Sequence, residues 1–536
     1  MKRKAAFQYT IYIVVLIGLF VFLAGCGSDE SAPSIDTSFI PQTVFFNDTG
    51  SMEYYLFQGR ATDNINVATV LVSSDNGATW SAAEIDKDPP NKNSDVEWSY
   101  LASSADISAG MHTVLVRASD RDDNETTSGS VILESISSAD PADLLALFSS
   151  AGAGDVIGLS TGAGFAFGDS VTALTIPINV DLTVQGSGYG NTITSGHPSF
   201  PAVMSTATIL QSLVSSASIF SVDADLSLKN LRLLGAGNAV RISDSAGPDP
   251  RLSVEDCVFD GQGAWAVYAE DDDAAVSVDF MSSIVDASNA DSLSGGGGLY
   301  LDNVSYTVTG SEFYFQSAAA PGAGVQILSG TGNISNSFFG GNALAIWAHN
   351  GSQQISSCNI TGSVSSTSNG VLFTGNVFGT SNMIHNRISE NMGYGVMISG
   401  DAPVIFEQNS IFLNSSGGVV LDYNFSSISK SPILGDCQAY NICDEGGRNS
   451  IFSNLPYDAI ATANTDGADV ILAQGNYWGP TKVSDAHVDQ VIKDGDTLLT
   501  TLRVPPLTPD LGEDSPNAWA KLNFLPFNAT GNDPND

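Results

Sequence analysis

The chain has few basic residues. Its 536 residues include 19 Lys and Arg against 58 Asp and Glu, which gives a formal net charge of -39 at pH 7. Nucleic acids and anionic lipid surfaces bind to clusters of Lys and Arg, so this deficit argues against both as partners. The shortage is sharpest across residues 252–386, where no Lys or Arg occurs. Such a tract would repel a polyuronate, which argues against lyase action on pectin or alginate.

Cysteine and histidine are scarce as well, at five residues each. The histidines show no metal-ligand spacing, so no metal site is expected from them. Cys437 and Cys443, in the run CQAYNIC, are candidates for a local disulfide. Cys257 and Cys358 stand alone in the sequence, and Cys26 lies close to the N-terminus.

The N-terminus carries an export pattern. A basic MKRK precedes an apolar run at residues 11–22 that is too short to span a bilayer, and Leu23-Ala24-Gly25-Cys26 follows directly. This pattern resembles a bacterial lipoprotein signal peptide, here residues 1–25. The resemblance implies cleavage before Cys26, lipidation of that cysteine by chains such as palmitate, and membrane anchoring in the extracytoplasmic cell envelope. In a Gram-negative cell, Gly27 would fit sorting to the outer membrane or cell surface. The alternative is an ordinary signal peptide.

Residues 26–36 are rich in Ser, Asp and Pro, which predicts a tether. From residue 37 to 136, short alternating segments such as EYYLFQGRA and HTVLVRASD predict about seven strands and an Ig-like β-sandwich. Within it, Ser73 to Trp80 matches the S-x-D-x-G-x-T-W Asp-box, which also occurs in sialidase-like propeller blades. One copy does not make a propeller, so its Asp and Gly indicate a hairpin turn and its Trp indicates packing.

A repeated unit organises the remainder of the chain. The stretches NMIHNRISENMGYGVMIS and VIFEQNSIFLNSSGGVVLD each place an Asn three residues after an apolar residue, and a second apolar segment follows. We expect two short strands per unit, stacked as a β-solenoid. The position of this Asn recurs along the chain as a ladder of mostly small or polar residues: Leu231, Cys257, Ser283, Ser311, Ser337, Cys358, Asn386, Asn409, Asn449 and Asn476. The ladder accounts for Cys257 and Cys358, and the long interval before Asn449 places the other cysteine pair on an insertion.

Both ends of this repeat region resemble a known family. Residues 140–150 predict a helix with Asp140 as N-cap and Pro141 at its first position, followed by GDVIGLSTG and VDLTVQGSG. This order resembles the start of right-handed parallel β-helices in the pectate-lyase-like superfamily. The segment containing Asn476, Trp478, Gly479, Asp494 and Gly495 resembles a closing cap of bacterial parallel β-helices.

The resemblance implies an all-β chain: an N-terminal Ig-like β-sandwich followed by a right-handed parallel β-helix solenoid. The β-helix would occupy residues 138–512, including an N-terminal capping helix and a C-terminal cap, and residues 513–536 would form a tail. The superfamily includes lyases, hydrolases, epimerases, adhesins and accessory proteins, so the fold does not specify the function.

Known catalytic motifs on this fold are incomplete here. Asn464 begins an N-T-D-G run that matches the first polygalacturonase element, but no D-D, G-H-G or R-I-K follows it. Asp271, Asp272 and Asp273, beside Glu270, form an acidic run that is either a weak Ca²⁺ site or a solvated turn. We therefore assign no catalytic residue and no cofactor.

An outward column is the main candidate for a functional surface. If the apolar residues of each second segment face inward, the residues between them face outward on one sheet. The column comprises Arg241, Tyr268, Tyr300, Gln326, Trp347, Leu372, Met397 and Val420, and Glu270, Asp302, His349 and Asp422 lie two residues after four of its members. Aromatic rings suit the C–H faces of sugars, and carboxylates suit their hydroxyl groups. From Tyr268 to Trp347 the column spans three coil steps, roughly 14 Å.

The candidate glycan-binding residues are therefore Tyr268, Tyr300, Trp347, Glu270, Asp302 and His349. The competing interpretation is that the insertion after Leu421, or the sandwich, covers the apolar half of the column. For function, the sequence favours a cell-envelope lipoprotein that acts as a non-catalytic surface module and binds glycan or a protein partner. The alternative is a polysaccharide-degrading enzyme, a glycoside hydrolase or lyase, that uses Glu270 and Asp302.

Overall fold

The structure is a computed structural model. It describes residues 31–48, 53–85, 94–161, 165–167, 175–187, 208–212, 214, 217–243, 249–286, 297–314, 322–363, 368–375, 379–422, 432–439, 442–447, 449–455, 458–461, 471–472, 492–493 and 502–503. The predicted signal peptide with Cys26, the C-terminal cap residues and the tail lie outside the described residues.

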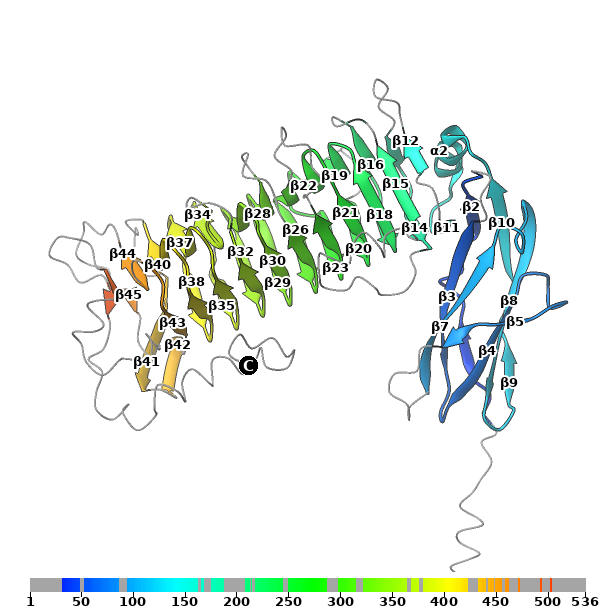
Figure 1. The fold of residues 1–536 in the computed structure, drawn as a ribbon, viewed down its shortest axis with the longest axis horizontal. Helices are drawn as coiled ribbons and strands as arrows, with labels where there is room; N and C mark the ends of the chain where they lie inside the picture. Colours follow the sequence, from blue (N-terminus) through cyan, green and yellow to red (C-terminus); the bar gives the residue numbers. More distant parts are fainter. Residues whose placement is uncertain are drawn as a thin grey trace, which may run out of the picture. The chain divides into compact units, whose positions relative to one another are not determined.

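The chain divides into two compact units (Figure 1). The first ends at Val44 and resumes from Tyr54 to Ile136, and the second combines Phe45–Glu53 with the chain from Ser137 onward. The range 37–136 expected for the sandwich therefore includes a segment, Phe45–Glu53, that belongs to the second unit. In that unit, the Ser160 hydroxyl donates to the buried Glu53 carboxylate at 2.7 Å.

The first unit is built mainly from antiparallel strands in two sheets. One sheet has the order β1-β3-β7-β6, and the other runs β2-β10-β8-β4-β5, with β9 beside β8. The bounds are β1 (Ser34–Asp36), β2 (Thr43–Phe46), β3 (Tyr54–Thr62), β4 (Val67–Ser73), β5 (Ser81–Ala82), β6 (Glu84–Ile85), β7 (Asp95–Ser103), β8 (Gly110–Asp120), β9 (Glu125–Thr127) and β10 (Val131–Ser137). Alternating burial along β8 places Val114, Val116 and Ala118 in the core. The Ig-like assignment of this unit stays a prediction.

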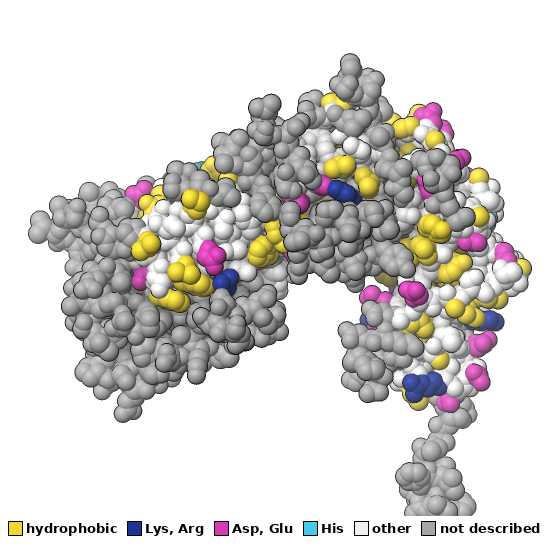
Figure 2. All heavy atoms as spheres, viewed as in Figure 1, with side chains coloured by type: hydrophobic (Ala, Val, Ile, Leu, Met, Phe, Trp, Pro, Cys, Tyr) yellow, Lys and Arg dark blue, Asp and Glu magenta, His cyan; other side chains and the backbone are white. Residues whose placement is uncertain are grey.

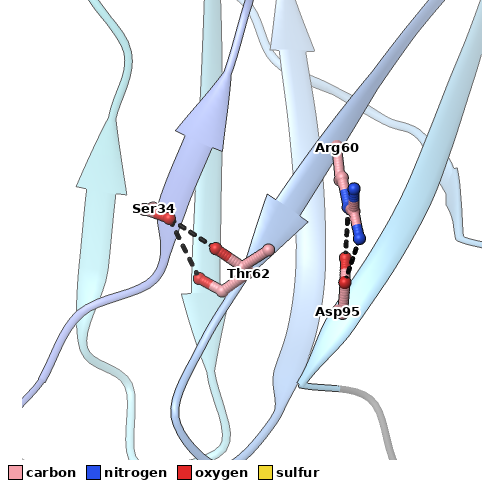
Figure 3. Close-up of polar contacts among 4 residues, drawn as sticks. All are labelled: Ser34, Arg60, Thr62 and Asp95. Atoms are coloured by element: carbon pink, nitrogen blue, oxygen red, sulfur yellow. Dashed lines mark hydrogen bonds and ion pairs between the residues drawn. The ribbon is translucent and has the colours of Figure 1, made fainter.

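Polar pairs join neighbouring strands of the first sheet (Figure 3). The Ser34 and Thr62 hydroxyls lie 2.6 Å apart between β1 and β3, and Arg60 on β3 donates to both carboxylate oxygens of Asp95 on β7. The hydrogen bonds from Arg60 hold the pKa of Asp95 below its usual value. Both partners are well exposed, so this ion pair contributes little to stability.

The Asp-box forms the hairpin between β4 and β5. The Asp75 carboxylate accepts from the backbone N–H of Thr79 at 2.8 Å and from its hydroxyl at 2.6 Å, which lowers the pKa of Asp75 to about 2. Gly77 has a φ of 85°, a conformation that glycine adopts without strain. The guanidinium of Arg117 lies 4.5 Å from the Trp80 ring centroid. These contacts confirm a structural turn.

The second unit starts with helix α2 (Pro141–Ser150). Asp140 is its N-cap and accepts from the backbone N–H of Ala142, as the sequence predicts. The helix buries Leu144 and Phe148, and the Phe148 ring lies 6.2 Å from that of Phe220. The helix therefore packs its apolar side on the solenoid that follows.

The solenoid has three parallel sheets, which run along its length in Figure 1. The first sheet contains β11 (Asp155–Leu159), β14 (Leu182–Gly186), β17 (Leu226–Lys229), β20 (Arg251–Glu255), β23 (Ser277–Met281), β26 (Val304–Thr309), β29 (Gly330–Ser335), β32 (Ser352–Ser356), β35 (Ser381–Ile384) and β38 (Val404–Glu407).

The second sheet contains β12 (Phe165–Phe167), β15 (Thr208–Ser212), β18 (Leu231–Gly235), β21 (Val258–Asp260), β24 (Ile284–Asp286), β27 (Glu312–Tyr314), β30 (Phe338–Gly340), β33 (Asn359–Thr361), β36 (Arg387–Ser389), β39 (Ser410–Phe412) and β43 (Ser450–Phe452).

The third sheet contains β13 (Ile176–Ile178), β16 (Ser218–Val222), β19 (Asn238–Ser243), β22 (Trp265–Glu270), β25 (Gly297–Asp302), β28 (Ala323–Ile327), β31 (Leu344–Ala348), β34 (Val371–Thr374), β37 (Tyr394–Ser399), β40 (Gly417–Leu421), β44 (Ala459–Ala461) and β46 (Ile492–Lys493). Two further pairs are β41 (Gly435–Ala439) with β42 (Ile442–Gly446), and β45 (Ile471–Leu472) with β47 (Leu502–Arg503). The parallel stacking confirms the expected β-helix fold.

The number of strands per coil differs from the sequence expectation. A coil has three strands rather than two. The segment around each ladder residue was expected to form one strand, but the chain turns a corner just before the ladder residue and forms two. The residue at this corner has a positive φ, for example 52° at Asp256, 50° at Asn336 and 57° at His385. A residue in this left-handed region ends a strand, so Met383 and Ile388 lie in different sheets.

The ladder predicted from the sequence is a hydrogen-bonded column inside the solenoid, which we call the inner ladder. The backbone N–H of Cys257 donates to the Ser283 hydroxyl at 3.0 Å. The N–H of Asn386 donates to Asn409 Oδ1 at 3.0 Å, and that of Asn409 to Asn449 Oδ1 at 2.9 Å. These side chains are buried, so each bond satisfies a backbone group that water does not reach.

A second polar ladder lies five residues further along each coil. The N–H of Asn391 donates to Asn414 Oδ1 at 3.2 Å, and that of Asn414 to Asn454 Oδ1 at 3.0 Å. This ladder was not predicted, although the repeated N-x-x-x-x-N spacing in NRISEN, NSIFLN and NSIFSN is its signal in the sequence.

Candidate functional site

The third sheet aligns the predicted outward column in register; we call it the outer column. Arg241 pairs with Tyr268, Tyr268 with Tyr300, and Tyr300 with Gln326. The series continues through Trp347, Leu372, Met397 and Val420. The residues on either side of each member are buried, so members of the column leave the sheet on its outer side. Adjacent members are about 4.8 Å apart along the solenoid.

The two tyrosines stack on each other. The rings of Tyr268 and Tyr300 lie 4.6 Å apart with an interplanar angle of 2°. The Arg241 guanidinium lies 5.4 Å from the centroid of Tyr268, and Trp265 lies 5.4 Å from Tyr300. The ring faces therefore contact protein groups. Both tyrosines are partly exposed, so a ligand would meet ring edges and hydroxyl groups rather than an open ring face.

Two carboxylates flank the stacked rings. Glu270 and Asp302 are register partners on β22 and β25. The Tyr268 hydroxyl donates to Glu270 at 2.7 Å, and the Ser329 hydroxyl donates to Asp302 at 2.8 Å. Burial raises the pKa of Tyr268, and the hydrogen bond to Glu270 and its charge raise it further. Burial also raises the pKa of Tyr300, with smaller contributions from Asp302 and Glu270. Both phenols are therefore neutral donors near neutral pH.

Trp347 and His349 converge on one hydroxyl. Trp347 Nε1 donates to Thr374 Oγ1 at 2.8 Å, and His349 Nδ1 lies 2.9 Å from the same oxygen. The bond from the indole fixes the orientation of the Trp347 ring. Thr374 belongs to β34, the next strand of the sheet, and the sequence analysis did not include it. The sequence feature that could have identified Thr374 is its position, one coil after His349 in the same register.

Gln326 lies between Tyr300 and Trp347 in the column and is 4% exposed. Its Oε1 atom is buried and has no hydrogen-bond partner in the described part of the chain. A buried acceptor without a donor costs about 1–3 kcal/mol. Within the described outer column, Gln326 Oε1 is the only buried side-chain acceptor without a hydrogen-bond donor; we call it the orphaned oxygen.

The apolar half of the column also combines partly exposed and buried residues. Val420 is 2% exposed, while Leu372 and Met397 are partly buried. Burial therefore does not separate the two halves, because Leu372 and Met397 are partly exposed like the aromatic residues, and Gln326 in the aromatic half is 4% exposed. The six candidate residues are brought onto one sheet face, and Tyr268, Tyr300 and Trp347 all keep exposed surface.

The acidic turn after β22 gathers a different set of residues from the expected one. Carboxylate oxygens of Asp249, Asp271 and Asp273 lie within 4.8 Å of one another, and Asp272 is not among them. Asp271 accepts from the backbone N–H of Val276 at 2.9 Å. Burial alone would raise the pKa of Asp271, but hydrogen bonds from backbone N–H groups of the turn outweigh it and lower the pKa. Ca²⁺ at this turn stays a prediction.

The four cysteines of the solenoid fall into two kinds. Cys257 and Cys358 are buried free thiols in the inner ladder, and burial raises the pKa of each to about 12. Cys437 on β41 is the register partner of Cys443 on β42. Opposed residues of antiparallel strands have Cα atoms about 4.5–5.5 Å apart, within the range for a disulfide, which stays a prediction.

Three basic side chains in the described part of the solenoid pair with acids. Lys229 contacts Glu255 at 2.8 Å, Arg251 contacts Asp279, and Arg232 contacts Asp260. In the view of Figure 2, basic side chains are sparse beside acidic and hydrophobic ones. No helix of the described residues has the length and apolar character needed to cross a membrane.

The fold defines this chain as a parallel β-helix protein. A mostly antiparallel β unit precedes the β-helix in the sequence. No protein-family model and no curated protein matches the chain. Among solved structures, it is similar to a crystal structure of a mutant of the periplasmic alginate epimerase AlgG. The identity is 11%, the TM-score is 0.24, and the match covers 65% of this chain and 76% of that chain.

Proposed function

We propose that the protein is a cell-envelope lipoprotein that binds glycan, without catalysis, along the aromatic half of the outer column. The observation that carries this proposal is the in-register alignment of Tyr268, Tyr300 and Trp347 with Glu270 and Asp302 beside them. Aromatic edges next to hydrogen-bonding carboxylates suit the mixed apolar and hydroxylated surface of a sugar.

The geometry also suits an extended ligand. The outer column repeats at about 4.8 Å per coil, so equivalent contacts recur along the solenoid axis. A linear polymer that lies along this axis meets several contacts at once, and binding at one coil raises the effective concentration at the next. The proposed anchor at Cys26 would hold this surface at the membrane.

The alternative is a polysaccharide-degrading enzyme that uses Glu270 and Asp302. Their separation of about one coil approaches the 5–5.5 Å of a retaining glycosidase pair, but every register pair in a solenoid has this spacing. Glu270 accepts from Tyr268, and Asp302 accepts from Ser329, which suits carboxylates that orient a ligand. These bonds favour binding over catalysis.

The test is a panel of immobilised polysaccharides probed with the detergent-solubilised full chain, combined with a reducing-end assay on the bound glycans. We expect retention without new reducing ends or unsaturated products. Chain cleavage that disappears in Glu270→Gln and Asp302→Asn variants would instead establish the enzyme. For the anchor, metabolic labelling with palmitate should mark the wild-type chain and not a Cys26→Ser variant.

A further inference from the structure

We propose that the ligand of the outer column is an amino-sugar oligosaccharide that carries ammonium groups, and that Gln326 is the residue that selects it. This inference rests on the proposed glycan binding and adds the chemical class of the glycan. Three observations carry it: the acceptor-rich lining, the charge of the surrounding coils, and the orphaned oxygen of Gln326.

The lining offers mainly acceptors. The Glu270 and Asp302 carboxylates accept hydrogen bonds only, and Gln326 on the next strand adds a third acceptor, its buried Oε1, together with the donors of its NH2 group. Among the donors, the Tyr268 hydroxyl and the Trp347 indole N–H are already bonded to Glu270 and Thr374, and the Tyr300 hydroxyl adds one further donor to the lining. A ligand that complements this lining must bring donors, and an ammonium group brings three.

Charge points to the same class of ligand. No Lys or Arg occurs across residues 252–386, which include the strands that carry Tyr268, Gln326 and Trp347. Arg241 lies at one end of the column, over the ring of Tyr268. A uronate would face Glu270 and Asp302 without a compensating base. An ammonium sugar makes charge-assisted hydrogen bonds with the same carboxylates.

Gln326 supplies the independent sign of a ligand. Gln326 is only 4% exposed, and its side chain leaves the sheet on the same side as those of Tyr300 and Trp347. Its Oε1 has no donor in the described part of the chain. A protein tolerates an unpaired buried acceptor at a site whose ligand supplies the missing donor. Removal of this acceptor should therefore weaken binding without lowering stability.

The experiment compares oligomers of equal length by titration calorimetry against the detergent-solubilised full chain, at low and high salt. The probes are oligomers of glucosamine, N-acetylglucosamine and galacturonic acid. We expect the glucosamine oligomer to bind about tenfold more tightly than the N-acetylated one, because charge-assisted bonds are the stronger ones. Its affinity should fall as salt rises, and the galacturonate oligomer should not bind.

Variants test the residue assignment. Gln326→Met keeps the size of the side chain and removes the acceptor, so we expect about fivefold weaker binding and an unchanged or raised Tm. Gln326→Leu serves as the second variant. Glu390→Gln is the matched control, since Glu390 is an exposed acid of the solenoid that follows β36 in the second sheet. It should leave affinity unchanged, whereas Glu270→Gln should weaken it.

The outcomes separate the two proposals. If the N-acetylated oligomer binds as tightly as the glucosamine oligomer, the ligand class is wrong and glycan binding stands. If none of the three oligosaccharides binds, both proposals are overturned. If Gln326→Met and Gln326→Leu bind like the wild type, or unfold at a lower Tm, Gln326 is not the selecting residue.

Discussion

The inner ladder and the outer column run along the same solenoid with the same spacing, yet they use polar side chains in opposite ways. In the inner ladder, Asn386, Asn409 and Asn449 bond to one another and to backbone groups of neighbouring coils. In the outer column, Gln326 keeps an acceptor without a donor, and the rings of Tyr268 and Trp347 stay partly exposed. A saturated column stabilises the fold, and an unsaturated one is available for a ligand.

The largest expected effect is on stability, at the inner ladder. Asn409→Ala removes the acceptor of the Asn386 N–H and side-chain amide and the side-chain donor to the Met383 carbonyl, while Asn449 Oδ1 keeps the bond from the backbone N–H of residue 409. We expect a loss of about 3 kcal/mol in the free energy of unfolding, measured by urea titration. Gln354→Ala, at an exposed amide on β32, should cost less than about 0.5 kcal/mol. Equal costs for the two variants would contradict the structural role of the ladder.

The next effect is on binding, at the outer column. Trp347→Ala removes a partly exposed ring next to Gln326, and we expect affinity for the bound glycan to fall about 5- to 30-fold. The urea midpoint should change little, because the ring is not in the core. Leu372→Ala, one coil further, is the matched control with a smaller expected loss of affinity. A loss at Leu372 as large as that at Trp347 would move the site into the apolar half.

A third effect is the dependence of stability on pH through a buried phenol. Tyr306 donates to Gln353 Oε1 at 2.5 Å inside the solenoid, and burial raises its pKa above the ordinary value of about 10. Above about pH 10 the unfolded chain loses this proton while the folded chain keeps it, so stability falls as pH rises. Tyr306→Phe should cost about 1 kcal/mol at neutral pH and reduce the alkaline loss. Urea titrations at neutral pH and above about pH 10 measure the loss of stability. An unchanged alkaline loss in the variant would exclude Tyr306 as its source.

The smallest effect is expected at the ladder thiols. Cys358→Ser places a hydroxyl in a slot where Ser337 already serves on the preceding coil, so we expect a change within about 1 kcal/mol. Because burial raises the pKa of Cys257 and Cys358 to about 12, neither thiol should react with a thiol reagent at neutral pH until the solenoid unfolds. Rapid labelling of the folded protein would show that the inner ladder opens locally.

The solenoid and the outer column were predictable because their signals are periodic. Buried alternation around Tyr268, Tyr300 and Trp347 sets which residues face outward, and the register follows from stacking. The third strand of each coil was not predictable, since three-residue strands such as β36 carry no period and the corner residues, apart from Gly310, are polar types rather than glycine.

The details of the site depend on contacts between coils. The stacking of Tyr268 on Tyr300 depends on side-chain rotamers, and Thr374 joins the site from the neighbouring strand. Gln326 is 4% exposed and has Tyr300 and Trp347 as its register partners on the neighbouring strands. None of these features appears in the local sequence, because each one joins residues that are more than twenty positions apart.

The interval between Asn409 and Asn449 has a consequence for how this protein can vary. Their hydrogen bond spans 40 residues, whereas the equivalent bond from Asn386 to Asn409 spans 23, and β39 still pairs directly with β43. The extra chain, with the hairpin β41–β42, is thus accommodated without loss of a rung. The solenoid behaves as a modular scaffold at this corner, where foreign peptides of different length could be grafted while the stack keeps its pitch.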